Sequence, residues 1–155
     1  MYLIDANNLA GQLGWLKKPD FDKQLVKVLM AYFSQKLKKA KIIFDGNDFL
    51  AGRQNYGQVE IIYAHNSADD KIIALIQQAK RGQAFVLVTN DRELQERARQ
   101  IIKNSGKTIK FLKSSDFAYD LQKQGRQQFD DKDDKSFLSQ REIEKINREL
   151  LELWT

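Results

Sequence analysis

Five aspartates stand where apolar runs end or where helical patterns begin. Asp5 and Asp45 each directly follow an apolar run, although aspartate is disfavoured inside strands. Asp69, Asp70 and Asp91 open segments of helical spacing. Carboxylates that gather at one place repel each other unless cations lie between them, and their hard oxygen atoms suit Mg²⁺ or Mn²⁺. If these side chains converge, they predict a site for one or two such ions, which is a common arrangement for phosphodiester hydrolysis.

The apolar pattern predicts a fold that would bring these side chains together. Short runs that are apolar at consecutive positions alternate with longer helical patterns, as in parallel strands covered on both faces. The expected strands are Tyr2–Asp5, Lys41–Asp45, Val59–Tyr63, Ala84–Thr89 and Thr108–Leu112. The expected helices cover residues 21–37, 72–79, 94–102 and 114–124. This alternation predicts an α/β protein, a three-layer α/β/α sandwich with a mostly parallel central sheet.

The carboxyl ends of parallel strands meet at one edge of a sheet, where ligands usually bind. Four separate segments of this chain would deliver carboxylates to that edge. Asp69, Asp70 and Asp91, each taken singly, are better explained as ordinary helix N-caps. Asp5 and Asp45 have no such simple explanation, and the set as a whole favours a cation site. His65 is the only histidine, and a single loop histidine is usually solvated.

The composition limits the class of protein. The chain has 155 residues, of which 42% are hydrophobic, with 9 Phe, 5 Tyr and 2 Trp, enough for a packed core. It contains no cysteine, which excludes disulfides, thiolate metal sites and cysteine nucleophiles. Its apolar runs are too short to cross a bilayer, and it opens without a signal-type stretch. We therefore expect a cytoplasmic protein without membrane association, and a monomer.

The charge is distributed unevenly. The net charge is +5, with a net of +8 over residues 1–128 and of −3 over residues 129–155. The change occurs at a run of aspartates and lysines over residues 130–135, which is typical of a solvated linker. We expect a main domain over residues 1–128, an acidic linker over 129–138 and a C-terminal helix over 139–155 that packs on the domain.

Four motifs in this chain resemble those of one family. They are Met1-Tyr-Leu-Ile-Asp-Ala-Asn-Asn8, Ile42-Ile-Phe-Asp-Gly46, Ser67-Ala-Asp-Asp-Lys-Ile-Ile73 and Val88-Thr-Asn-Asp-Arg-Glu-Leu-Gln95. Their order and spacing are similar to those of NYN domains, a branch of the PIN-like nuclease superfamily. The nearest likeness is to its YacP-like group, which includes a ribosome-associated endoribonuclease of Firmicutes. The resemblance covers about residues 1–125.

The resemblance implies roles for individual residues. Asp5, Asp45, Asp69 and Asp91 match the family's catalytic, metal-binding acids, and Asp70 is an alternative to Asp69 as the ligand. The substrate-positioning residues it implies are Asn8, Thr89 and Asn90. Position 7 is asparagine where tyrosine is commoner in the family, and Asn90 stands where serine is commoner.

An enzyme that acts on RNA also needs cations near its acidic crevice. We expect these from basic residues that follow the predicted strands, and a stacking contact from an aromatic one. The candidates are Lys17, Lys18, Arg53, Tyr56, Arg92 and Lys113. A denser cluster, Lys36, Lys38, Lys39 and Lys41, falls at the opposite edge, where complementation of a helix C-terminus explains it.

Together these features predict an Mg²⁺- or Mn²⁺-dependent endoribonuclease that hydrolyses single-stranded RNA. The resemblance to the YacP-like group adds mRNA as a candidate substrate and the ribosome as a candidate partner. A structure-specific DNA nuclease is one alternative, because the same arrangement of acids serves both nucleic acids. A non-catalytic RNA- or ribosome-binding module with the same fold is another. Such a module, however, would gain nothing from acids that repel each other.

Overall fold

A computed structural model describes residues 1–46 and 52–135 of the chain, which divides into two compact units, Met1–Tyr119 and Asp120–Thr155. The strands are β1 (Tyr2–Asp5), β2 (Ala40–Asp45), β3 (Gly52–Tyr56), β4 (Val59–Ala64), β5 (Ala84–Val88) and β6 (Thr108–Leu112). The helices are α1 (Ala6–Leu13), α2 (Phe21–Lys36), α3 (Ala68–Gln78), α4 (Arg92–Ile102) and α5 (Ser114–Lys135).

One six-stranded sheet organises the first unit, in the order β3-β4-β2-β1-β5-β6. Every neighbouring pair is parallel except β3 and β4, which are antiparallel. β1 lies between β2 and β5, with Ile4 paired to Ile42 on one side and to Val88 on the other. The carboxyl ends of the five parallel strands therefore lie at the same edge, and β1 brings its last residue to the middle of that edge.

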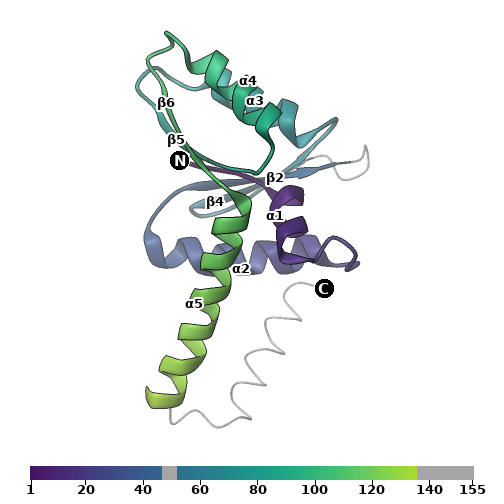
Figure 1. The fold of residues 1–155 in the computed structure, drawn as a ribbon, viewed down its shortest axis with the longest axis vertical. Helices are drawn as coiled ribbons and strands as arrows, with labels where there is room; N and C mark the ends of the chain where they lie inside the picture. The colour runs from purple at the N-terminus through teal and green to yellow at the C-terminus, as the bar shows by residue number, and fades with distance from the viewer. Residues whose placement is uncertain (47–51, 136–155) are drawn as a thin grey trace. The chain divides into compact units, whose positions relative to one another are not determined.

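Helices cover both faces of the sheet (Figure 1). On one face α3 and α4 pack against a core cluster that includes Leu3, Ile43 and Leu87. On the other face the rings of α2 and of the start of α5 pack against the sheet. Tyr2 on β1 lies 5.0 Å from Phe33, ring centre to ring centre, and 6.5 Å from Phe117. The predicted three-layer sandwich with a mostly parallel sheet is confirmed.

Two elements were missing from the sequence prediction. β3 has few apolar side chains, and among the described strands it pairs with β4 alone, through the backbone. α1 begins directly after β1, with Asp5 as its N-cap, and buries Leu9 and Ala10.

The prediction also placed the end of α5 too early. The helix continues past the expected end near residue 124 to Lys135, because no proline interrupts it and charged residues are compatible with a helix. The part of the predicted linker up to Lys135 is therefore helical. The predicted C-terminal helix over 139–155 lies outside the described residues. Within the described part of the chain, no helix is both long and apolar enough to cross a membrane.

Candidate active site

Asp5 is the most buried acid of the sheet edge. It ends β1, and only 6% of it is exposed. Its Oδ1 accepts a hydrogen bond from the backbone N–H of Asn8 at 3.5 Å, which caps α1. Burial, followed by the neighbouring charge of Asp69, raises the pKa of Asp5 to about 6, although its hydrogen bond from Thr89 acts in the opposite direction. This carboxylate is poorly solvated and lies beside other negative charges.

Asp45 ends β2, the strand next to β1. Its Oδ1 accepts a hydrogen bond from the backbone N–H of Ala68 at 2.8 Å, which links the end of β2 to the start of α3. Its own backbone N–H donates to Oδ1 of Asn7 at 3.1 Å. Gly46 follows, and a Cβ built at that position would lie 2.0 Å from the carbonyl oxygen of Ala64. Only glycine fits between the ends of β2 and β4 without a backbone shift.

Thr89 connects two of the acids. Its hydroxyl donates to Oδ2 of Asp5 at 3.1 Å and accepts from the backbone N–H of Asp91 at 3.1 Å. Thr89 is fully buried, and its carbonyl oxygen accepts from the Gln95 side chain at 3.0 Å. Asp91 in turn caps α4, because its Oδ1 accepts from the backbone N–H groups of Glu93 and Leu94. One threonine thus fixes the ends of β1 and β5 relative to each other.

Asp69 and Asp70, both in the first turn of α3, have different surroundings. Asp70 is exposed, and its Oδ1 pairs with Arg97 Nη2 at 2.9 Å, which lowers its pKa. Asp69 is half-buried, and its pKa is raised by burial first and then by the charges of Asp91 and Asp45. Among the described residues, Asp69 accepts no hydrogen bond. Asp69 is therefore the acid of this turn that faces the other site carboxylates.

Asn8 and Asn90 join the loops around the acids. Oδ1 of Asn8 accepts a hydrogen bond from the backbone N–H of Asn90 at 2.9 Å. Oδ1 of Asn90 in turn accepts one from the backbone N–H of Ser115 at 3.4 Å. These bonds run from the start of α1, through the loop after β5, to the start of α5. Both asparagines, expected to position substrate, use their side-chain oxygens to hold the site loops together.

Four elements therefore bring Asp5, Asp45, Asp69 and Asp91 to one edge, where they act on each other electrostatically. Within residues 1–46 and 52–135, no three acidic or histidine side chains form a ready-made metal-binding group. The donor set nonetheless has the chemistry that Mg²⁺ or Mn²⁺ requires, since all of its ligand atoms are hard oxygens. The raised pKa values of Asp5 and Asp69 indicate negative charge that a cation would relieve.

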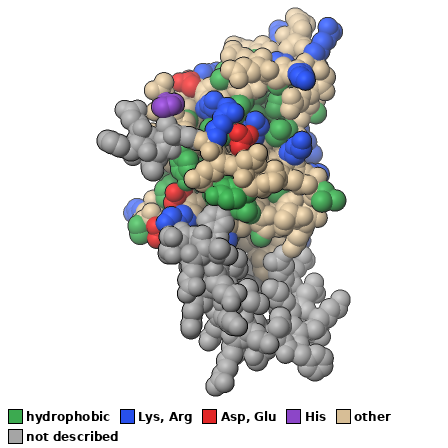
Figure 2. Space-filling model, turned by 180° about the vertical axis from the view of Figure 1, so that it is seen from behind, with side chains coloured by type: hydrophobic (Ala, Val, Ile, Leu, Met, Phe, Trp, Pro, Cys, Tyr) green, Lys and Arg blue, Asp and Glu red, His purple; other side chains and the backbone are tan. Residues whose placement is uncertain are grey.

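Two of the expected RNA contacts lie at this edge. Arg92 directly follows Asp91, Lys113 directly follows β6, and both side chains are exposed. Figure 2 shows basic side chains beside acidic ones on one face of the molecule. Lys17 and Lys18 are also exposed, but they follow α1 rather than β1. Their position in the chain therefore does not bring them to the carboxyl end of β1. Lys18 Nζ lies 5.4 Å from the centre of a ring of Trp15.

Arg53 and Tyr56 are not where the sequence placed them, because β3 runs antiparallel to the rest of the sheet. Arg53 pairs with Glu60 at 3.5 Å and lines a small pocket with Lys41 and Gln83, residues near the amino ends of β2 and β5. Tyr56 pairs in register with Val59, the first residue of β4, and is 43% exposed. The expectation that both lie near the acids is wrong, since β3 carries the chain back toward the opposite edge.

The sequence reasoning missed the residues that position the acids. Asn7 was taken only as a departure from the usual family pattern, yet it holds the backbone of Asp45. Ser67 caps α3 through the N–H of Asp70, and Arg97 binds the Asp70 side chain. A serine before a helical pattern is a recognisable cap signal. No local pattern reveals the contacts of Asn7 and Arg97, which join residues far apart in the chain.

Comparison with known proteins agrees with this architecture. The family model of the YacP-like NYN domain matches residues 2–155 of the chain. No curated protein and no solved structure matches the chain. NYN domains are in general nucleases, which are hydrolases. The match extends over nearly the whole chain, and the fold is the PIN-like sandwich expected of such domains. The chain therefore belongs to the YacP-like NYN domain family.

Proposed function

We propose that this protein is a metal-dependent endoribonuclease that hydrolyses phosphodiester bonds of single-stranded RNA. One observation carries the proposal: four separate elements bring Asp5, Asp45, Asp69 and Asp91 to the same sheet edge, where burial and mutual repulsion raise the pKa of Asp5 and Asp69. In a domain that only bound RNA, this arrangement would weaken the binding, because a cluster of negative charges repels the phosphates of the RNA. Membership of a nuclease-type family supports the same conclusion.

The cofactor we propose is Mg²⁺ or Mn²⁺, as one or two ions held by the four acids. Bound there, a divalent ion would supply Lewis-acid chemistry, which acidifies water and neutralises charge on the phosphate. Thr89 would orient the Asp5 carboxylate and fix the backbone of Asp91, through the two hydrogen bonds of its hydroxyl. Asn7 would do the same for the backbone of Asp45.

The RNA contacts that we propose at this edge are made by the exposed side chains of Arg92 and Lys113. Their charges would offset the repulsion between the acids and the RNA backbone. Lys17 and Lys18 remain candidates for contacts with a part of the RNA that lies farther from the acids. We propose the ribosome as a further partner, on the resemblance to the YacP-like group.

The proposal is tested by incubating the protein with end-labelled single-stranded RNA in Mn²⁺, in Mg²⁺ and in EDTA. We expect cleavage that requires the metal and leaves a 5′-phosphate and a 3′-hydroxyl. Asp69→Asn should lower the rate at least about a hundredfold, as expected for loss of a group that stabilises the transition state. Asp20→Asn is the matched control, because Asp20 is exposed and its side chain makes no cap hydrogen bond.

Other results would overturn the proposal. RNA that binds tightly but is never cut, even when ribosomes are added, would indicate the binding module instead. Preferential cutting of branched DNA would indicate a structure-specific DNA nuclease. Cleavage at the same rate in EDTA would exclude the metal mechanism.

A further inference from the structure

The connections at the edge of the sheet opposite the acids carry cationic residues and no acidic one. Four connections lead into the amino ends of the strands there: residues 37–39, 57–58, 79–83 and 103–107. They contain six cationic residues and no acidic one, namely Lys38, Lys39, Lys80, Arg81, Lys103 and Lys107. We call these four connections the amino-terminal edge. Two of these residues, Lys38 and Lys39, belong to the lysine cluster that the sequence placed at the edge opposite the acids.

Helix ends account for only part of this charge. Lys107 Nζ donates to the carbonyl oxygens of Ile76 and Gln77 at 2.8 and 3.0 Å, so it caps the end of α3. Lys41, just inside β2, pairs with Glu60 at 3.0 Å. Lys38 and Lys39 are both exposed and have no acidic partner among the described residues. Helix capping therefore does not explain these two lysines.

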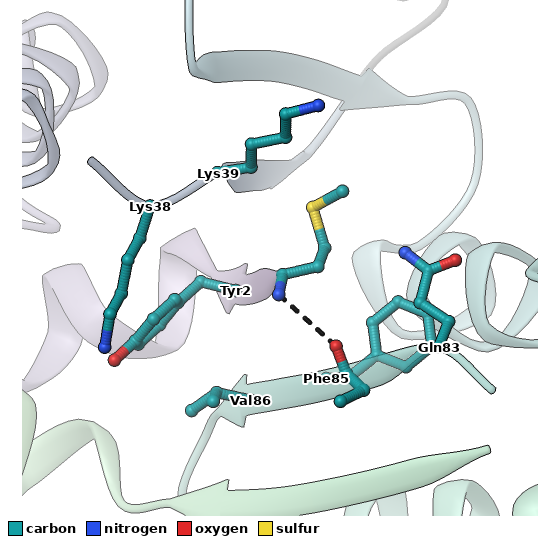
Figure 3. A pocket seen from close by; sticks show the side chains of 8 residues that line it. Tyr2, Lys38, Lys39, Gln83, Phe85 and Val86 are labelled. Atoms are coloured by element: carbon teal, nitrogen blue, oxygen red, sulfur yellow. Dashed lines mark hydrogen bonds between the residues drawn. The ribbon is translucent and has the colours of Figure 1, made fainter. Parts of the chain in front are cut away.

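A pocket of about 510 Å³ opens beside these two lysines. Its lining includes Tyr2, Lys38, Lys39 and Gln83 (Figure 3). Lys38 Nζ lies 5.7 Å from the centre of the Tyr2 ring, and the dashed line in the figure is a hydrogen bond from the Met1 amine to the carbonyl oxygen of Ala84 at 3.3 Å. The pocket thus combines flexible cations, an aromatic ring and a side-chain amide, the groups that recognise a phosphate and its attached nucleoside.

We propose that the amino-terminal edge is a second RNA-binding surface, which binds backbone phosphates without regard to sequence and seats one nucleotide unit in the pocket beside Lys38 and Lys39. The inference rests on the proposed function, since it takes RNA as the ligand. β1 has four residues, so the two edges are roughly 13 Å apart along the sheet. Measured across the sheet, the connection that leads into β2 and the one that leads into β6 are about 14 Å apart, which is three strand spacings. RNA can therefore be held at this surface while the acidic edge remains open to a single strand.

The experiment measures binding where the active site contributes nothing. A fluorescently labelled 16-base-pair RNA duplex with one unpaired nucleotide at each 3′ end is titrated with the protein in EDTA, at several concentrations of monovalent salt. Without a divalent ion the acidic edge repels RNA, and a duplex is not the proposed substrate. We expect Lys38→Gln/Lys39→Gln to lower affinity about tenfold or more at 0.1 M salt. The slope of log affinity against log salt should become shallower by about 1.8, which corresponds to two lost phosphate contacts.

The matched control is Lys23→Gln/Lys110→Gln, which removes the same charge from exposed positions on α2 and β6 outside the amino-terminal edge. It should change affinity by less than about twofold. Equal losses in both double variants would mean that only net charge matters and would overturn the proposal. It would also be overturned if the duplex failed to bind in EDTA, or if poly-glutamate of equal charge competed as well as unlabelled RNA.

A second measurement separates this inference from the proposed function. Cleavage of a dinucleotide in Mn²⁺ uses a substrate with a single phosphodiester, which is too short to reach from one edge to the other. We expect Lys38→Gln/Lys39→Gln to cleave it at the wild-type rate. Loss of that cleavage in the variant would count against two separate surfaces. Absence of cleavage in the wild-type protein, with duplex binding intact, would instead count against the proposed function alone.

Discussion

Asp69 and Asp70 are neighbours in one helical turn, yet their carboxylates have opposite electrostatic surroundings. Burial and the charges of Asp91 and Asp45 raise the pKa of Asp69, whereas Arg97 lowers that of the exposed Asp70. Successive positions on a helix differ by about 100°, so one side chain faces the acidic edge and the other faces α4. The motif alone leaves both residues as candidate ligands, but the structure separates their environments.

We therefore expect Asp69→Asn and Asp70→Asn to behave differently. Asp69→Asn should reduce metal-dependent RNA cleavage by two or more orders of magnitude. Asp70→Asn should change it less than about threefold, since it removes only an exposed ion pair. Cleavage rates measured over a range of Mn²⁺ concentrations would check this. A larger loss in Asp70→Asn would reverse the assignment.

The raised pKa of Asp5 predicts how the stability of the metal-free protein depends on pH. Its folded pKa of about 6 lies above the ordinary value of 3.8, so between these values the native state binds more protons than the unfolded state. The free energy of unfolding should fall as pH rises through this window. Asp5→Asn removes this cost and should be more stable than wild type by up to about 3 kcal/mol at pH 8. Urea unfolding of both proteins in EDTA at pH 4 and pH 8 measures this difference in the free energy of unfolding. A wild-type protein more stable than Asp5→Asn at pH 8 would contradict the prediction.

Metal loading should reverse this behaviour. A carboxylate must lose its proton to bind Mn²⁺, so the gain in melting temperature on adding Mn²⁺ should be larger at pH 8 than at pH 5. Thermal unfolding with and without the ion tests this. The Asp5→Asn variant is the control and should gain little at either pH. An equal gain in the variant would exclude Asp5 as a ligand.

Thr89 offers a test of positioning with little change in shape. Thr89→Val removes the hydrogen bond that lowers the pKa of Asp5 and leaves the backbone N–H of Asp91 without its acceptor. We expect the acidic limb of the pH–rate profile to move toward higher pH and the protein to lose about 1–3 kcal/mol of stability. Thr89→Ser keeps the hydroxyl and should retain the wild-type profile. Identical profiles for the two variants would remove Thr89 from this role.

Gly46 predicts a purely steric effect. A methyl group at this position would lie 2.0 Å from the Ala64 carbonyl oxygen, so Gly46→Ala must push apart the ends of β2 and β4. We expect a loss of about 2–4 kcal/mol in the free energy of unfolding. Gly125→Ala is the control, because nothing lies within 4 Å of its Cβ position in α5, and it should be neutral or stabilising by up to about 1 kcal/mol. Urea unfolding that ranks Gly46→Ala as the more stable variant would contradict the steric argument.

The sequence was sufficient for the parallel part of the fold, because strands buried on both faces are continuously apolar. The sequence did not predict β3 because Gly-Arg-Gln-Asn-Tyr has no apolar alternation, and among the described strands it pairs with β4 alone. The sequence did not predict α1 because two asparagines and a glycine weaken its helical propensity and apolar pattern. The helix is stabilised instead by the Asp5 cap and the burial of Leu9.

These two omissions explain the misplaced RNA contacts. Arg53 and Tyr56 belong to β3, which reverses direction, and α1 separates Lys17 and Lys18 from the end of β1. The acids were easier to locate, since each lies next to a strong apolar element. Their supporting contacts, such as that of Asn7 with Asp45, join residues 38 positions apart. Such contacts depend on the sheet order, which no local pattern contains.

Three helices begin among the site acids. Asp5 and Asp91 cap α1 and α4, and Asp69 lies in the first turn of α3. Each helix start carries a partial positive charge of about half a unit, so the peptide dipoles already offset part of the repulsion between the carboxylates. The carboxylates therefore oppose folding of the metal-free chain less strongly than their charges alone would. Under the proposed function, metal occupancy would be a reversible loading step, and the cell's supply of divalent ions would set how much of the folded protein is active at a given moment.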